Sequence, residues 1–254
     1  MDFLSERRIK ALNNFQNGRL LESARNWHNV SRINDYQYMF EVFGLPIIQD
    51  PQDIVMLQEM IWNFKPDLVI ETGVARGGSV VLSASILALF NYIESIKEIP
   101  VRNRCVIGID IEVRQKTSKD LSDHPLKSLI KVLEGSSVDE RILSQARSLI
   151  PEDHSVMVIL DSDHSHDHVL AELNLYSDLV TANMPLIVMD TGIEFAEPST
   201  LNPNRDWGKG NSPYSAVQSF LKSEKGQRFE TFLDIEMRHL ITCAPAGVLI
   251  KSRA

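Results

Sequence analysis

The segment LDSDHSHDHV, residues 160–169, gathers three Asp and three His into ten positions directly after an apolar run. Carboxylates and imidazoles are the side chains that hold divalent cations and move protons in active sites. A dinuclear zinc hydrolase would need H-x-H-x-D-H, but after His164 and His166 the next acid and imidazole, Asp167 and His168, each come one position early. We therefore expect these residues to act individually and not as a zinc cluster.

An iron site with two His and one carboxylate, drawn from Asp161, His164 and His166, is also disfavoured. Imidazoles two positions apart at a helix start do not converge easily on one ion. We interpret His166 and His168 as packing residues of the helix that follows. The preference of carboxylates for a helix N-terminus explains some of the aspartates in this segment.

Short apolar runs of the buried-strand type alternate with helix-compatible segments through the middle of the chain. We expect strands at 68–70, 105–109, 129–133, 156–160 and 185–189, and helices at 51–64, 78–92, 138–149 and 166–179. This alternation predicts an α/β fold with a mostly parallel sheet covered on both faces. A helix near 215–222 and strand-like runs near 230–235 and 248–251 follow, which predicts a closing antiparallel pair.

Two of the predicted strands end in an aspartate. Asp161 follows the run 156–160, and Asp190 follows the run 185–189. Because ligands of open α/β sheets bind beyond the carboxyl ends of the strands, both carboxylates should face one crevice. Two hard oxygen ligands in that position suit Mg²⁺ or Ca²⁺.

The first predicted strand runs into ETGVARGGS, residues 71–79, which opens a long helix. Its glycines, Gly73, Gly77 and Gly78, do not form the G-x-G-x-x-G of a dinucleotide site. No G-x-x-x-x-G-K-[ST] phosphate-binding loop follows. Glycines at a strand end still let the backbone approach a ligand closely.

Acids at neighbouring strand ends indicate the kind of ligand. Glu71 at the first strand end and Asp110 at the second can accept hydrogen bonds from an amine and from ribose hydroxyls, which suits a nucleoside without a pyrophosphate. The third strand end reads EGSS, residues 134–137, where small hydroxyls can contact an adenine edge. Ser137 is also a candidate N-cap of the next helix.

The composition is that of a soluble globular protein, with 43% hydrophobic and 24% charged residues. We find no apolar run near the roughly 20 residues of a membrane span and no signal-peptide core, so we expect a cytoplasmic protein without a membrane partner. The net charge of -8 disfavours nucleic acid as a partner. Cys105 and Cys243 lie in apolar contexts, and we expect both to be reduced and packed.

Four motifs together resemble one family. E-T-G-V-x-R-G-G-S, G-I-D-I, E-G-S-S and L-D-S-D-H-S-H-x-H-V look like motifs of the cephalosporin hydroxylases and rhamnosyl O-methyltransferases, a branch of the class I S-adenosylmethionine (SAM) dependent methyltransferases. The resemblance implies a Rossmann-like seven-stranded sheet and methyl transfer from SAM to a hydroxyl of a sugar or specialised metabolite. The residues that it assigns to SAM are Glu71, Gly73, Gly77, Ser79, Asp110 and Ser136, with Asp161 beside them.

The resemblance also bears on the metal. Metal-dependent relatives commonly place a divalent ion on the strand ends that Asp161 and Asp190 occupy here, which agrees with a Mg²⁺ site. At the strand end that carries Asp190, relatives often have two consecutive acidic or amide ligands. This chain has Met189 before Asp190, and methionine is no ligand for a hard cation. Thr191 or water would then complete the site, or the metal would bind weakly.

Methyl transfer also needs a group that takes the proton of the acceptor. Asp163 resembles the general base of related sugar methyltransferases. His164 is the competing candidate, because its unperturbed pKa lies nearer neutrality. The sequence leaves both open.

We expect residues 1–64 to form a helical N-terminal extension and residues 65–254 to form the SAM-binding domain. The extension favours a homo-oligomer, and its aromatic cluster would pack in the core, wall the pocket of a small-molecule acceptor or form an interface. The cluster consists of Trp27, Tyr36, Tyr38 and Phe40. The segment 205–213, which carries Trp207, is a candidate lid or an ordinary surface turn.

Two alternatives come from other functional classes. One is a catalytically inactive protein of the SAM fold that serves as a binding or scaffolding subunit. The other is a NAD-dependent oxidoreductase, which the missing dinucleotide motif disfavours.

Overall fold

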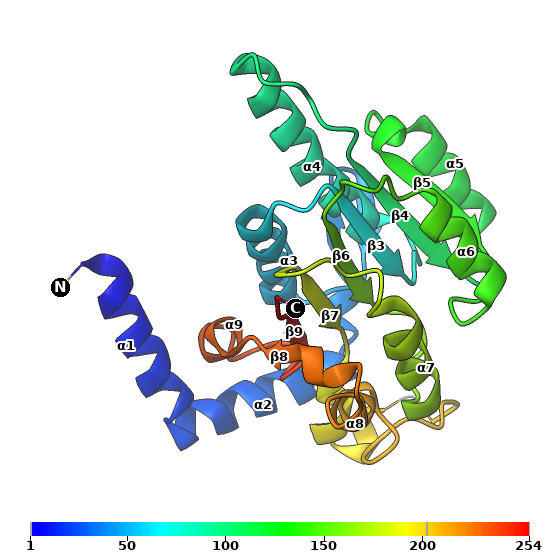
Figure 1. The fold of residues 1–254 in the computed structure, drawn as a ribbon. Helices are drawn as coiled ribbons and strands as arrows, with labels where there is room; N and C mark the ends of the chain where they lie inside the picture. The colour runs from blue at the N-terminus through cyan, green and yellow to red at the C-terminus, as the bar shows by residue number, and fades with distance from the viewer. Residues whose placement is uncertain (1, 202, 254) are drawn as a thin grey trace.

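A seven-stranded sheet forms the centre of the computed structural model, which describes residues 2–201 and 203–253 (Figure 1). From one edge to the other the strands are β5 (Ile130–Glu134), β4 (Cys105–Asp110), β3 (Leu68–Thr72), β6 (Val156–Leu160), β7 (Pro185–Val188), β9 (Val248–Lys251) and β8 (Phe229–Thr231). The first five are mutually parallel, and β9 is antiparallel to both β7 and β8. This arrangement confirms the predicted Rossmann-like sheet and its antiparallel end pair.

The strands are apolar because both faces of the sheet are covered. Alternate residues point to opposite faces, so Val69 joins one core cluster and Leu68 and Ile70 join the other. Helices α3 (Pro51–Phe64), α4 (Gly78–Ile96) and α5 (Gln115–Asp123) contribute to the first cluster. Helices α6 (Glu140–Ser148), α7 (His166–Tyr176) and α8 (Pro213–Phe220) contribute to the second.

Two sequence predictions about individual segments were wrong. The expected strand near 230–235 ends at Thr231, and a short helix, α9 (Leu233–Arg238), takes its place. The N-cap of α6 is Asp139, whose side chain accepts from Arg141 N, and not Ser137.

Helix α4 is long and apolar enough to cross a membrane by length and composition alone. The expectation that no segment reaches that length is therefore wrong. Val80, Val81 and Leu87 of this helix are completely buried, and the helix contacts α3 and β4 (Figure 1). Its packing assigns it to the core of the domain.

The N-terminal segment contains more than helices. Helices α1 (Phe3–Phe15) and α2 (Gly18–Ile33) lie away from the centre of the sheet, and α1 contacts α9 (Figure 1). A hairpin of β1 (Phe40–Val42) and β2 (Leu45–Ile47) follows, which the sequence prediction missed. Its buried residues belong to the same core cluster as α3 and α4.

Short 3-10 turns connect several of these elements. They are η1 (Tyr36–Tyr38), η2 (Lys127–Leu129), η3 (Thr191–Phe195), η4 (Pro198–Thr200) and η5 (Gly226–Arg228). Of these, η3 begins directly after Asp190, whose φ of 54° turns the chain sharply out of β7. The division of the chain at residue 64 into an N-terminal extension and a domain remains a prediction.

Gly73 brings two strand ends into contact. Its φ of +88° lies in the left-handed region, and a Cβ at this position would sit 1.9 Å from the carbonyl oxygen of Asp161. Only glycine permits both the dihedral and the close approach of the backbones. The turn after β3 and the segment after β6 are therefore held against each other, which places Asp161 beside the Gly-rich turn.

We expect Gly73→Ala to lower the free energy of unfolding by at least about 3 kcal/mol, because it adds a clash to dihedral strain. Gly44→Ala is a matched control, since Gly44 has a φ of +87° and nothing within 4 Å of an added Cβ. Gly44→Ala should lower the free energy of unfolding by only about 1–2 kcal/mol. Urea denaturation of both variants measures the difference, and equal losses would contradict the close contact.

Candidate active site

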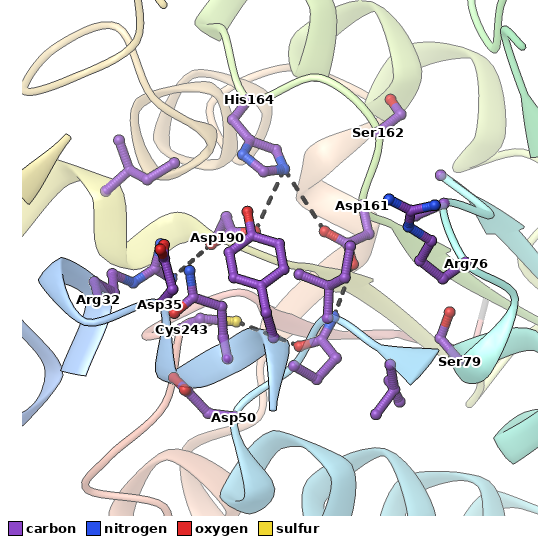
Figure 2. Close-up of a pocket in the computed structure, with 18 of the residues that line it drawn as sticks. Arg32, Asp35, Asp50, Arg76, Ser79, Asp161, Ser162, His164, Asp190 and Cys243 are labelled. Atoms are coloured by element: carbon purple, nitrogen blue, oxygen red, sulfur yellow. Dashed lines mark hydrogen bonds and ion pairs between the residues drawn. The ribbon is translucent and has the colours of Figure 1, made fainter. Parts of the chain in front are cut away.

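A cavity of about 630 Å³ opens beyond the carboxyl ends of β3, β6 and β7. The Gly-rich turn contributes Gly73, Ala75 and Ser79 to its wall, and the strand ends contribute Asp161 and Asp190. The predicted crevice therefore exists, and both aspartates face it. Figure 2 shows them converging from the two strand ends beneath the ring of His164.

His164 lies between the two carboxylates. Its Nε2 is 3.3 Å from Asp190 Oδ2 and 3.6 Å from Asp161 Oδ1. Each of these three side chains is less than one fifth exposed. One ligand atom from each lies within 4.8 Å of the others.

Two residues from the N-terminal part of the chain also donate to this pair. Arg32, on α2, donates from a guanidinium nitrogen to Asp190 Oδ1 at 2.7 Å. The amide of Gln49, just before α3, donates to Asp161 Oδ2 at 2.8 Å, and its oxygen accepts from Cys243 Sγ at 3.8 Å. Sequence reasoning missed Arg32 and Gln49, because no local pattern marks a partner that is more than a hundred residues away in the chain.

Burial and charge act in opposite directions on the three groups. Burial raises the pKa of Asp161 above its usual range, and the nearby Asp190 carboxylate raises it further. Burial would also raise the pKa of Asp190, but the charges of His164 and Arg32 hold it below its usual range. Burial would lower the pKa of His164, whereas the two carboxylates raise it above its usual value. Asp190 is thus the permanent anion of the cluster.

Glu71 lies behind the wall of the cavity and is completely buried. Its Oε1 accepts a hydrogen bond from Ser79, and its Oε2 has no partner among the described residues. Burial raises the pKa of Glu71 to about 8, although the Ser79 hydrogen bond opposes the shift. An unpaired buried carboxyl oxygen next to the cavity favours a cationic ligand group.

Asp110 supports the Gly-rich turn from the next strand. Its Oδ2 accepts from the backbone N–H groups of Val74 and Ala75, each at 2.9 Å. Its Oδ1 accepts from Glu112 N at 3.1 Å. The structure therefore gives this acid a bracing role, and its predicted contact with ribose remains a prediction.

The other residues predicted to contact SAM differ in their positions. Gly77 is the N-cap of α4, with a φ of 88°, and it lies behind the part of the wall formed by Gly78 and Ser79. Ser136 follows β5, and its carbonyl oxygen accepts from Asp139 N. Neither Asp110 nor Ser136 is part of the cavity wall.

Asp163 does not reach the cavity. Its Oδ1 accepts from Ser165 N at 2.9 Å and from Ser165 Oγ at 2.5 Å. Burial would raise the pKa of Asp163, but these hydrogen bonds lower it. A carboxylate that is occupied in this way is a weak base, so the geometry favours His164.

His166 and His168 hold elements together, as predicted. His166 Nδ1 lies 2.7 Å from Ser215 Oγ on α8. His168 Nε2 lies 3.1 Å from both Ser137 Oγ and Ser162 Oγ. Neither imidazole is part of the cavity wall.

The loop after η4 covers one side of the cavity. The ring of Trp207 lies 4.8 Å from that of His164, and the guanidinium of Arg205 stacks 4.8 Å from the indole. Tyr38 of the predicted aromatic cluster also lines the cavity, whereas Trp27 and Tyr36 pack edge to face. Trp207 lines the cavity, which favours the lid over the ordinary surface turn for the segment 205–213.

The donor set fits a divalent cation. Two carboxylates and one imidazole within 4.8 Å of one another suit an ion that completes its shell with water. Thr191 does not join them, because it is completely buried and its hydroxyl donates to Pro245 O. Of the two expected alternatives next to Asp190, Thr191 is therefore excluded and water remains, with the His164 imidazole as a further candidate ligand.

Comparisons with known proteins agree with this fold. The family model Rhamnosyl O-methyltransferase/CmcI matches residues 34–252. A rhamnosyl O-methyltransferase of Mycobacterium tuberculosis is 30% identical over 210 residues, which cover 82% of this chain and 77% of the relative. The enzyme of the same name from Mycobacterium leprae is also 30% identical, over 82% of this chain and 81% of the relative.

Solved structures share the fold at low sequence identity. An apo structure of CmcI has a TM-score of 0.53 and 18% identity over 85% of this chain and 78% of its own. An O-methyltransferase from Bacillus cereus in complex with S-adenosylhomocysteine (SAH) has a TM-score of 0.50 and 13% identity over 82% of this chain and 81% of its own. The extent of the family match decides the assignment. The chain belongs to the rhamnosyl O-methyltransferase/CmcI family.

Proposed function

We propose that this chain is a SAM-dependent O-methyltransferase acting on a hydroxyl of a sugar or of a specialised metabolite. The observation that carries the proposal is that one cavity joins the Gly-rich turn to the cluster of Asp161, His164 and Asp190. The rhamnosyl O-methyltransferase relatives support a sugar hydroxyl as the acceptor. A CmcI structure with Mg and SAM, which has a TM-score of 0.50, supports both cofactors.

The Gly-rich turn would hold the methionine end of SAM. When bound, SAM supplies an electrophilic methyl group on a sulfonium centre. The free Oε2 of Glu71 is suited to accept a hydrogen bond from the ammonium group, and Ser79 orients the carboxyl through Oε1. The positive φ of Gly73 lets the backbone approach the ligand.

The cluster after β6 and β7 would activate the acceptor. Neutral His164 takes the hydroxyl proton, and the two carboxylates that face its Nε2 stabilise the imidazolium that forms. Asp161 and Asp190 would hold a divalent cation, which supplies electrostatic stabilisation to the acceptor oxygen. Trp207 stacks near His164 and limits the access of water to the ring.

Binding of SAH near pH 7 should release up to about one proton, because Glu71, whose pKa is raised to about 8, must ionise to pair with an ammonium group. Calorimetric titration in buffers of different ionisation enthalpy measures the release. Affinity should rise with pH up to about 8, and the release should shrink near pH 9, where Glu71 is already ionised. Glu71→Gln should bind more weakly with less proton release, and binding independent of buffer would contradict the assignment.

His164→Asn should lower turnover by about 10²–10⁴-fold, the usual contribution of a general base, while SAH affinity changes little. SAH formation with a panel of sugar glycosides measures turnover, and His166→Asn is the control because its ring packs on α8. Retained Mn²⁺ affinity in His164→Asn supports a base, and lost affinity identifies a metal ligand instead. SAH binding without turnover of any acceptor by the wild type would favour the inactive scaffold.

We also propose that the chain forms a homo-oligomer. Apolar side chains are exposed along α1 and α2, among them Phe3, Leu4, Leu12 and Val30, and exposed apolar surface favours association. Light scattering after gel filtration should give a multiple of the chain mass, and Leu4→Glu should reduce it. A monomeric mass for the wild type would contradict the proposal.

A further inference from the structure

Arg32 occupies a specific position in the cluster. It lies in the last turn of α2, and its side chain is 19% exposed. Its terminal nitrogen donates to Asp190 Oδ1 at 2.7 Å, and its Nε donates to His28 Nε2 at 3.2 Å, one helical turn earlier. The guanidinium is therefore held at both ends and directed into the cavity (Figure 2).

Protein donors face every oxygen of the two carboxylates. Arg32 and His164 face the two oxygens of Asp190, and Gln49 and His164 face those of Asp161. Of these groups, Arg32 alone carries a charge that cannot be removed by deprotonation. A divalent cation on Asp190 would meet the repulsion of this guanidinium at close range in a largely buried site.

We propose that Arg32 is an internal counter-cation that competes with the divalent ion for Asp190. The inference rests on the proposed function, because it concerns the same metal site. When the ion binds, Arg32 loses its partner and α2 loses its hydrogen bond to the cluster. Arg32, Ile33 and Tyr38 line the cavity, so metal binding changes the wall that the N-terminal segment presents to the acceptor.

The test compares Mn²⁺ affinity of the full chain, measured at neutral pH by the electron paramagnetic resonance of free Mn²⁺. Arg32→Met should bind Mn²⁺ about tenfold more tightly than the wild type, which corresponds to one competing ion pair. Arg25→Met is the matched control, because Arg25 is an exposed arginine on the same helix and loses the same charge. Its affinity should stay within about twofold of wild type.

A second variant and a second readout distinguish a change in metal affinity from misfolding of Arg32→Met. Arg32→Lys keeps the charge without the planar fork and should fall between the wild type and Arg32→Met. In the wild type, saturating Mn²⁺ should increase hydrogen exchange of the last turns of α2. Unchanged or weaker Mn²⁺ binding by Arg32→Met, or unchanged exchange in α2, would overturn the inference.

Asp190→Asn separates this inference from the proposed function. If Asp190→Asn loses Mn²⁺ binding while Arg32→Met matches the wild type, the metal site stands and only the competition fails. If Asp190→Asn binds Mn²⁺ as well as the wild type, the metal site itself fails, and the competition fails with it. SAH binding measured on the same samples reports separately on the SAM site.

Discussion

The repulsion between Asp161 and Asp190 is the constraint around which the site is arranged. Parallel strands β6 and β7 end side by side, so the residues that follow them bring two carboxylates into one largely buried cavity. Such a pair is stable only when hydrogen bonds and opposite charges compensate it. His164 faces both carboxylates from the loop that begins with Asp161. Arg32 and Gln49 donate to them from the N-terminal part of the chain.

This requirement adds to the packing contacts between parts of the chain that are distant in sequence. The backbone contact between Gly73 and Asp161 joins the Gly-rich turn to the carboxylates, so the proposed methyl donor and acceptor share one rigid edge of the sheet. Asp110 keeps the same turn in place through two backbone hydrogen bonds. The N-terminal helices complete the charge balance and also form part of the cavity wall. Binding of ions and acceptor is therefore expected to depend on how α2 is docked.

Local patterns predicted the parts of the site that the strand ends dictate. Asp161 and Asp190 were found because a carboxylate that directly follows a buried parallel strand must face the carboxyl edge of the sheet. The choice between Asp163 and His164 could not be made in this way, because both lie in the same loop. Only the hydrogen bonds of Asp163 with Ser165 show which of the two is turned away from the cavity.

Sequence patterns were enough to predict the α/β alternation, the central strands, the Gly-rich turn and the two aspartates, because periodicity and strand-end position are local properties. Tertiary structure alone decided the β1–β2 hairpin, the helix α9, the bracing role of Asp110 and the partners Arg32 and Gln49. The roles of Asp110, Arg32 and Gln49 depend on contacts between distant segments, whose energies come from burial and charge compensation, whereas the hairpin pairs residues no more than seven positions apart. No spacing rule along the chain contains that information, since Arg32 and Asp190 are 158 positions apart.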